Sequence, residues 1–116
     1  MKNVTKMAAQ GDVVFVRVLS IPKNAVPVKR TGPAVVAHSE TGHHHVIKEP
    51  CVQVMTTDDP LICYLRMEVP FADVEHMRPF DTHETLRLVG DRQGESLWCV
   101  RRQREYTPDG WRMVQD

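Results

Sequence analysis

The chain has 116 residues, enough for one domain with a hydrophobic core of its own and too few for two. Hydrophobic residues make up 41% of the chain and charged residues 26%, which is typical of a folded globular protein and excludes a disordered one. Fifteen basic and fifteen acidic side chains give a formal net charge of zero, which argues against a protein that coats nucleic acid.

The first half of the chain has the pattern of short β-strands separated by turns. Residues 1–10 are expected to form a flexible N-terminal segment in front of a single β domain over residues 11–116. Turn signals stand at Gly11-Asp12 and Thr41-Gly42, and a proline-rich loop lies between them. The apolar, β-branched runs between these breaks predict strands over residues 13–19, 34–38, 43–48 and 52–55.

The second half continues this pattern and predicts strands over residues 62–69, 85–89 and 97–103. The turn signal Thr107-Pro108-Asp109-Gly110 is expected to fold residues 111–114 back on a strand that ends at Tyr106. The stretch from Pro70 to Thr82 is the least β-like, and we expect at most one short helix in it, near Phe71 to Met77. Seven to eight short strands without alternating helices predict an all-β fold, either a small barrel or a sandwich.

The clearest chemical signal is the histidine run at residues 43–45. Alternate side chains of a strand share a face, so His43 and His45 are expected to point the same way, with Glu49 in the same parity. Two imidazoles so placed can bind one ion, but a stable metal centre needs further ligands from elsewhere in the chain. The sequence therefore predicts a divalent-metal site, with zinc as the first expectation, whose candidate ligands are His43, His45, Glu49, His76 and His83. The alternative is that these histidines are surface residues that bind no ion.

The spacing His43-x-His45-xxx-Glu49 resembles the first metal-binding motif of the cupins, which are small β-barrels. In that motif two histidines and a glutamate bind a divalent metal. The resemblance covers residues 43–49 and implies a small metalloenzyme of unknown substrate, with iron, manganese or nickel as its metal.

A second resemblance covers more of the chain. Gln10-Gly11-Asp12, Thr41-Gly42-His43 and the stretch RQREYTP over residues 102–108 are similar to a set of small uncharacterised proteins of bacteria and phages. This resemblance implies a shared fold and supplies no activity.

Arginines and aromatic residues gather near the C-terminal end of the sequence. Arginine and tryptophan are enriched at protein-binding hot spots, and both can stack on single-stranded bases. The predicted partner-binding residues are Trp98, Arg102, Arg104, Tyr106 and Trp111. In the alternative interpretation the tryptophans close the core and the arginines form ion pairs in solvent.

The three cysteines, Cys51, Cys63 and Cys99, include no CxxC pair and are odd in number, so we expect buried thiols rather than a disulfide framework. No apolar run is long enough to span a bilayer, and the first ten residues lack the apolar core of a signal peptide. The sequence therefore predicts a cytoplasmic protein of a bacterium or an infected host cell.

Two functions remain open at this point. The first is a small noncatalytic interaction module, a bacterial or phage accessory protein that binds a protein partner or itself and carries the candidate metal site. The second is the cupin-like metalloenzyme, which would need an open metal position and a general acid or base nearby.

Overall fold

The computed structural model describes residues 1–38, 44–77, 84–91, 94–102, 104–107 and 110–113, and for residues 38, 77, 104–107 and 110–113 it describes the backbone alone. These residues contain strands and no helix, which confirms the all-β prediction. It follows that they contain no helix that is long and apolar enough to cross a membrane.

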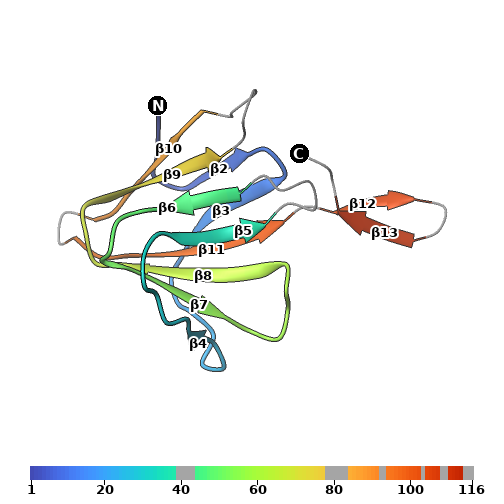
Figure 1. The fold of residues 1–116 in the computed structure, drawn as a ribbon, viewed down its shortest axis with the longest axis horizontal. Helices are drawn as coiled ribbons and strands as arrows, with labels where there is room; N and C mark the ends of the chain where they lie inside the picture. Colours follow the sequence, from blue (N-terminus) through green and yellow to red (C-terminus); the bar gives the residue numbers. More distant parts are fainter. Residues whose placement is uncertain (39–43, 78–83, 92–93, 103, 108–109, 114–116) are drawn as a thin grey trace.

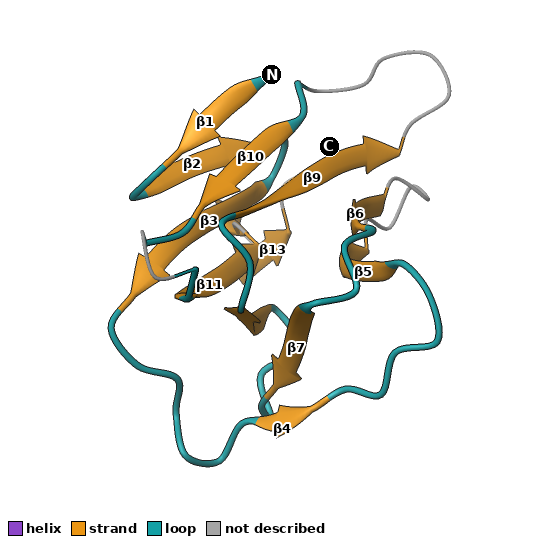
Figure 2. Ribbon diagram, turned by 90° about the vertical axis from the view of Figure 1, so that its left-hand side faces the viewer, coloured by secondary structure: helices purple, strands orange, loops and turns teal. Residues whose placement is uncertain are grey.

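The strands form two open sheets that pack face to face as a small β-sandwich, rather than a closed barrel (Figure 1). The first sheet has the order β1 (Lys2–Val4), β10 (Leu86–Val89), β9 (Phe71–Met77), β6 (His44–Ile47) and β5 (Ala34–His38). The second sheet has the order β2 (Met7–Gln10), β3 (Val13–Val18), β11 (Ser96–Arg102), β8 (Ile62–Met67), β7 (Val52–Thr56) and β4 (Val26–Pro27). Strands β1 and β2 lie at one side of the sandwich, and β7 and β4 lie at the other (Figure 2).

The core lies between the sheets, where alternate residues of each strand turn inward. On the second sheet the largest of these side chains are Trp98, Phe15, Leu65 and Met67, and all four are fully buried. The first sheet covers them with smaller inward-facing residues from β6, β9 and β10, namely Ile47, Ala72, Val74, Leu86 and Leu88.

One expectation about the elements is wrong, and one strand lies where the sequence predicted none. The N-terminal segment forms β1 and β2, and the buried Val4, Ala8 and Gln10 place these strands within the sandwich. The segment Phe71–Met77 is strand β9 and contains no helix, because Ala72, Val74 and His76 alternate with exposed or half-buried residues. An alternation of this kind buries one face of a strand, whereas a helix would need apolar residues three or four apart.

A third, separate sheet is the hairpin of β12 (Arg104–Thr107) and β13 (Gly110–Met113). Thr107 pairs with Gly110 in this hairpin, which confirms the predicted reversal of the chain. Figure 1 shows the hairpin projecting from one end of the sandwich.

Candidate functional site: a buried polar cluster beside an apolar groove

Two of the five predicted metal ligands, His45 and His76, lie side by side in the interior. They are register partners on the neighbouring strands β6 and β9. His45 is fully buried and His76 is 3% exposed, and the centroids of their rings are 4.5 Å apart. His45 and Ile47, two residues apart on β6, are both fully buried.

Gln10, which no chemical argument singled out, holds His45 in place. Its Oε1 lies 2.8 Å from Nδ1 of His45, and its Nε2 donates hydrogen bonds to the carbonyl oxygens of Val74 and Glu84, each at 2.9 Å. Because an amide oxygen only accepts, the proton of this pair sits on Nδ1 of His45. Gln10 therefore ties β2 of the second sheet to both β6 and β9 of the first.

Asp12 lies on the other side of His45. Its Oδ1 is 3.8 Å from Nε2 of His45, and its Oδ2 accepts a hydrogen bond from Nη2 of Arg102 at 3.3 Å. The Asp12 side chain is 1% exposed and the Arg102 side chain is 13% exposed, so this is an interior ion pair. Gly11 lies in the turn between β2 and β3, directly before Asp12, and has a φ of 60°. Glycine adopts this backbone conformation readily.

We define the buried cluster as Gln10, Asp12, His45, His76 and Arg102. A buried charge is tolerated only when it is paired and hydrogen-bonded, and the cluster meets that requirement by joining groups from five strands or turns. Gln10, Asp12, His45 and His76 are each 3% exposed or less, so the arrangement favours a positioning role for these four residues over direct contact with a substrate.

The remaining predicted ligands do not join this cluster among the described residues. Glu49 lies beyond the end of β6, and its Oε1 accepts a hydrogen bond from the backbone N–H of Asp73 at 3.1 Å. Asp73 is three residues from His76 along β9, roughly 10 Å in an extended strand, so Glu49 belongs to a different network. Arg30 completes that network by donating to the carbonyl oxygens of Glu49 and Ile47.

The other two ligands, His43 and His83, lie outside the described residues. Within the part of the chain that the structure describes, no group of three or more His, Cys, Asp or Glu side chains has the spacing of a metal site.

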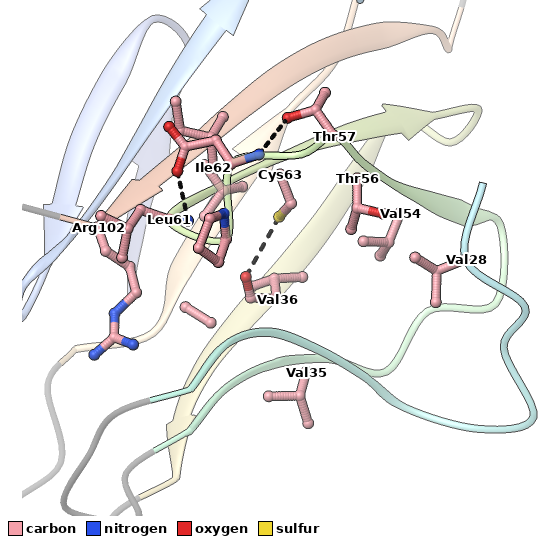
Figure 3. A pocket seen from close by; sticks show the side chains of 14 residues that line it. Val28, Val35, Val36, Val54, Thr56, Thr57, Leu61, Ile62, Cys63 and Arg102 are labelled. Atoms are coloured by element: carbon pink, nitrogen blue, oxygen red, sulfur yellow. Dashed lines mark hydrogen bonds between the residues drawn. The ribbon is translucent and has the colours of Figure 1, made fainter. Parts of the chain in front are cut away.

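A groove of about 330 Å³ lies beside the cluster, between the edge strand β5 and the turn that joins β7 to β8 (Figure 3). Its lining is mainly aliphatic and includes Val28, Val35, Val36, Val54 and Leu61. Val28 is 43% exposed and Val35 is 37% exposed. The guanidinium of Arg102 stands at the end of the groove that lies away from Val28 and Val54.

Side-chain hydrogen bonds hold both walls of this groove. Sγ of Cys63 on β8 donates to the carbonyl oxygen of Val36 on β5 at 3.3 Å. In the β7–β8 turn, Oδ1 of Asp59 accepts from the N–H of Leu61 at 2.9 Å. The register of β5 on β6 shifts between Val35 and Ala37, which leaves Val36 as an extra residue without a partner on β6.

The predicted partner-binding residues divide into two groups. Trp98 is fully buried in the core and its Nε1 donates to Oγ of Ser96 at 2.8 Å, so it is a core residue, as the alternative interpretation expected. Arg102 is largely buried and donates a hydrogen bond to Asp12. Arg104, Tyr106 and Trp111 lie on the hairpin, where Tyr106 and Trp111 are register partners, and their side chains lie outside the described part of the structure.

The fold and the site together define a small open β-sandwich with a buried His–Asp–Arg cluster and an apolar groove. The chain matches the family described as Domain of unknown function (DUF8820) over residues 9–103, and it belongs to that family. The matched range includes every residue of the buried cluster and of the groove and ends before the β12–β13 hairpin. The comparisons with curated proteins and with solved structures found no match.

Proposed function

We propose that this protein is a noncatalytic interaction module that binds an extended segment of a partner protein along β5 and in the groove beside it. The observation that carries the proposal is an apolar groove beside β5, a strand that pairs with β6 alone among the described residues. Extended peptides commonly bind by adding a strand to a free sheet edge, with side-chain pockets beside that edge supplying specificity.

The sequence of β5 supports this role. Within the two described sheets the edge strands are β1, β2, β4 and β5, with 3, 4, 2 and 5 residues, so β5 is the longest. Proteins commonly protect a free edge with charged residues or proline, and β4 ends in Pro27 in this way. The stretch AVVAH of β5 contains neither proline nor an Asp, Glu, Lys or Arg.

The burial of the polar cluster supports a noncatalytic role. Asp12, His45 and His76 are each 3% exposed or less, whereas a general acid or base has to reach a bound substrate. Val28 and Val35, which line the groove, are exposed and can contact a bound segment.

Panning of a random peptide library tests the proposal. The peptides are fused through their N-termini, so that their C-termini are free, and are selected on the immobilised protein. We expect enriched peptides with alternating apolar residues that bind the wild type at least ten times more tightly than Val28→Glu or Val35→Glu, because a charge in an apolar groove is costly. Val26→Glu is the matched control, since Val26 is an exposed valine of β4 outside the groove. A library that yields no binder, or binders that ignore Val28→Glu and Val35→Glu, would overturn the proposal.

A second candidate function is divalent-metal binding at the buried cluster. It is supported by the two adjacent imidazoles and by the 3.8 Å between Nε2 of His45 and Oδ1 of Asp12. Zinc bonds to nitrogen and oxygen are about 2.0–2.2 Å long, so one ion can lie between two donors at such a spacing.

Elemental analysis of untagged protein, purified without chelator and without a nickel column, tests this second candidate. We expect near-stoichiometric zinc in the wild type and in His44→Asn, and its loss in His45→Asn/His76→Asn. Iron, manganese or nickel in place of zinc would instead favour the cupin-like enzyme. Wild type that stays free of metal after incubation with zinc rules the site out.

A further inference from the structure

The arginine at the end of the groove has hydrogen-bond donors to spare. A guanidinium carries five N–H donors, and among the described residues that of Arg102 donates one hydrogen bond, from Nη2 to Asp12. Nε of Arg102 is buried and has no hydrogen-bond acceptor within that part of the chain. The Arg102 side chain as a whole is 13% exposed and lines the groove, so an acceptor bound in the groove can reach its guanidinium.

The buried cluster fixes where these donors stand. Asp12 binds the guanidinium from the interior side at a site that is 1% exposed, and breaking a buried ion pair is costly. Gln10 holds His45, and His45 lies against Asp12, so the carboxylate is itself enclosed by fixed groups. Arg102 is therefore held in one position at the groove end before any ligand binds.

The ligand must combine an anionic group with an apolar body. A planar guanidinium pairs best with a carboxylate, through two parallel N–H···O bonds. The groove that leads to Arg102 from Val28 and Val54 is mainly aliphatic, and the acidic residue in its lining, Asp59, accepts a hydrogen bond from the N–H of Leu61 (Figure 3).

Resting on the proposed function, we infer that the bound segment is the C-terminus of a partner chain. Its main-chain carboxylate binds Arg102, and its last apolar side chains occupy the groove beside β5. A chain end supplies both features at once, because the terminal carboxylate stands directly beside the last side chain.

The test uses the peptides enriched in the panning, each synthesised as the free acid and as the C-terminal amide. We expect the wild type to bind the acid at least tenfold more tightly than the amide, since hydrogen bonds to charged groups are the stronger class. Arg102→Gln/Asp12→Asn removes both charges together and leaves no unpaired ion inside, and it should bind acid and amide equally. Arg102→Lys keeps the charge but loses the planar fork, so it should fall between these two. Thermal melting of each variant, read beside the titrations, establishes that it is folded.

The remaining outcomes overturn either the inference about the C-terminus or the proposed function. If the wild type binds the acid and the amide equally, the inference that a C-terminal carboxylate binds Arg102 is wrong, and the groove remains a candidate peptide site. Peptides that bind through an internal acidic residue would also contradict the inference about the C-terminal carboxylate. If sedimentation shows a dimer that Val35→Glu dissociates and that no peptide displaces, a second copy occupies the groove and the inference is wrong. A panning without binders removes the proposed function itself.

Discussion

At the scale of single residues, the side-chain amide of Gln10 connects the two sheets of the sandwich. Its amide bonds to His45 and to two main-chain carbonyl oxygens, at Val74 and Glu84, and it is 2% exposed. In Gln10→Ala, Nδ1–H of His45 loses its acceptor inside the protein, and an unsatisfied buried donor costs about 1–3 kcal/mol. We expect the free energy of unfolding, measured by urea denaturation, to fall by at least that amount. Gln53→Ala on the exposed face of β7 is the matched control and should change stability by less than about 0.5 kcal/mol. Equal losses in the two variants would mean that the cluster does not connect the sheets.

The cysteines give a second prediction at this scale. Burial raises the pKa of the Cys63 thiol from 9.0 to about 12, with a smaller contribution from Cys99. Burial also raises the pKa of Cys99, whereas Cys51 is exposed. Because the thiolate is the reactive form, a thiol reagent at pH 8 should label one cysteine in the native protein and three in denaturant. Mass spectrometry of the digested protein should find the native label on Cys51, and rapid native labelling of Cys63 would contradict this burial.

The raised pKa of Cys63 also makes stability depend on pH. The folded state keeps the thiol protonated to about pH 12, whereas the unfolded chain begins to lose that proton near 9.0. The contribution of this group is therefore fully present below pH 9.0 and is lost progressively as the pH rises toward 12. In Cys63→Ala this part of the alkaline destabilisation should disappear, which urea denaturation at pH 8 and pH 10.5 can measure. The same pH dependence in both proteins would assign the effect to other groups.

At the scale of elements, the sequence predicts the strands well where one face is apolar and the other polar. The alternation in β8, where Cys63, Leu65 and Met67 turn inward, was sufficient to place that strand. It failed for β9, because Pro70 and the acidic residues within the strand obscured the short period of Ala72, Val74 and His76. It also failed for β1, β2 and β4, which have two to four residues and are too short to carry a pattern.

The site was less predictable than the strands for a physical reason. The parity of one strand is enough to turn His45 inward, but the bond from Gln10 to Val74 joins residues 64 apart and that from Arg102 to Asp12 joins residues 90 apart. Contacts at such separations depend on how the two sheets stack, which a pattern within one strand does not contain. The groove depends on the same stacking, so no pattern along one strand indicates it.

The arrangement of the elements predicts which of them open first. Strands β8 and β11 are interior to the second sheet and hydrogen-bonded on both sides, whereas β1 and β4 are edges of three and two residues. Hydrogen exchange followed by NMR should therefore find the slowest amides in β8 and β11 and the fastest strand amides in β1 and β4. Amides of β4 that exchange as slowly as those of β8 would contradict the edge position of β4.

At the scale of the whole molecule, the sandwich and the β12–β13 hairpin are separable parts. The hairpin pairs with neither large sheet, and the family match ends at residue 103, just before it. An isolated two-stranded hairpin is marginally stable in water, so this one adds little to the stability of the sandwich. A chain that ends after residue 103 should therefore fold, with a melting temperature within a few degrees of the full chain.

The same truncation separates the groove from the residues first predicted to bind a partner. Arg104, Tyr106 and Trp111 are removed with the hairpin, while Arg102 and the lining of the groove remain. If the groove is the binding site, the truncated chain should bind the enriched peptides with unchanged affinity, measured by calorimetry. Lost binding together with an unchanged melting temperature would move the partner site to the hairpin, whereas a chain that fails to fold would show that the hairpin belongs to the domain.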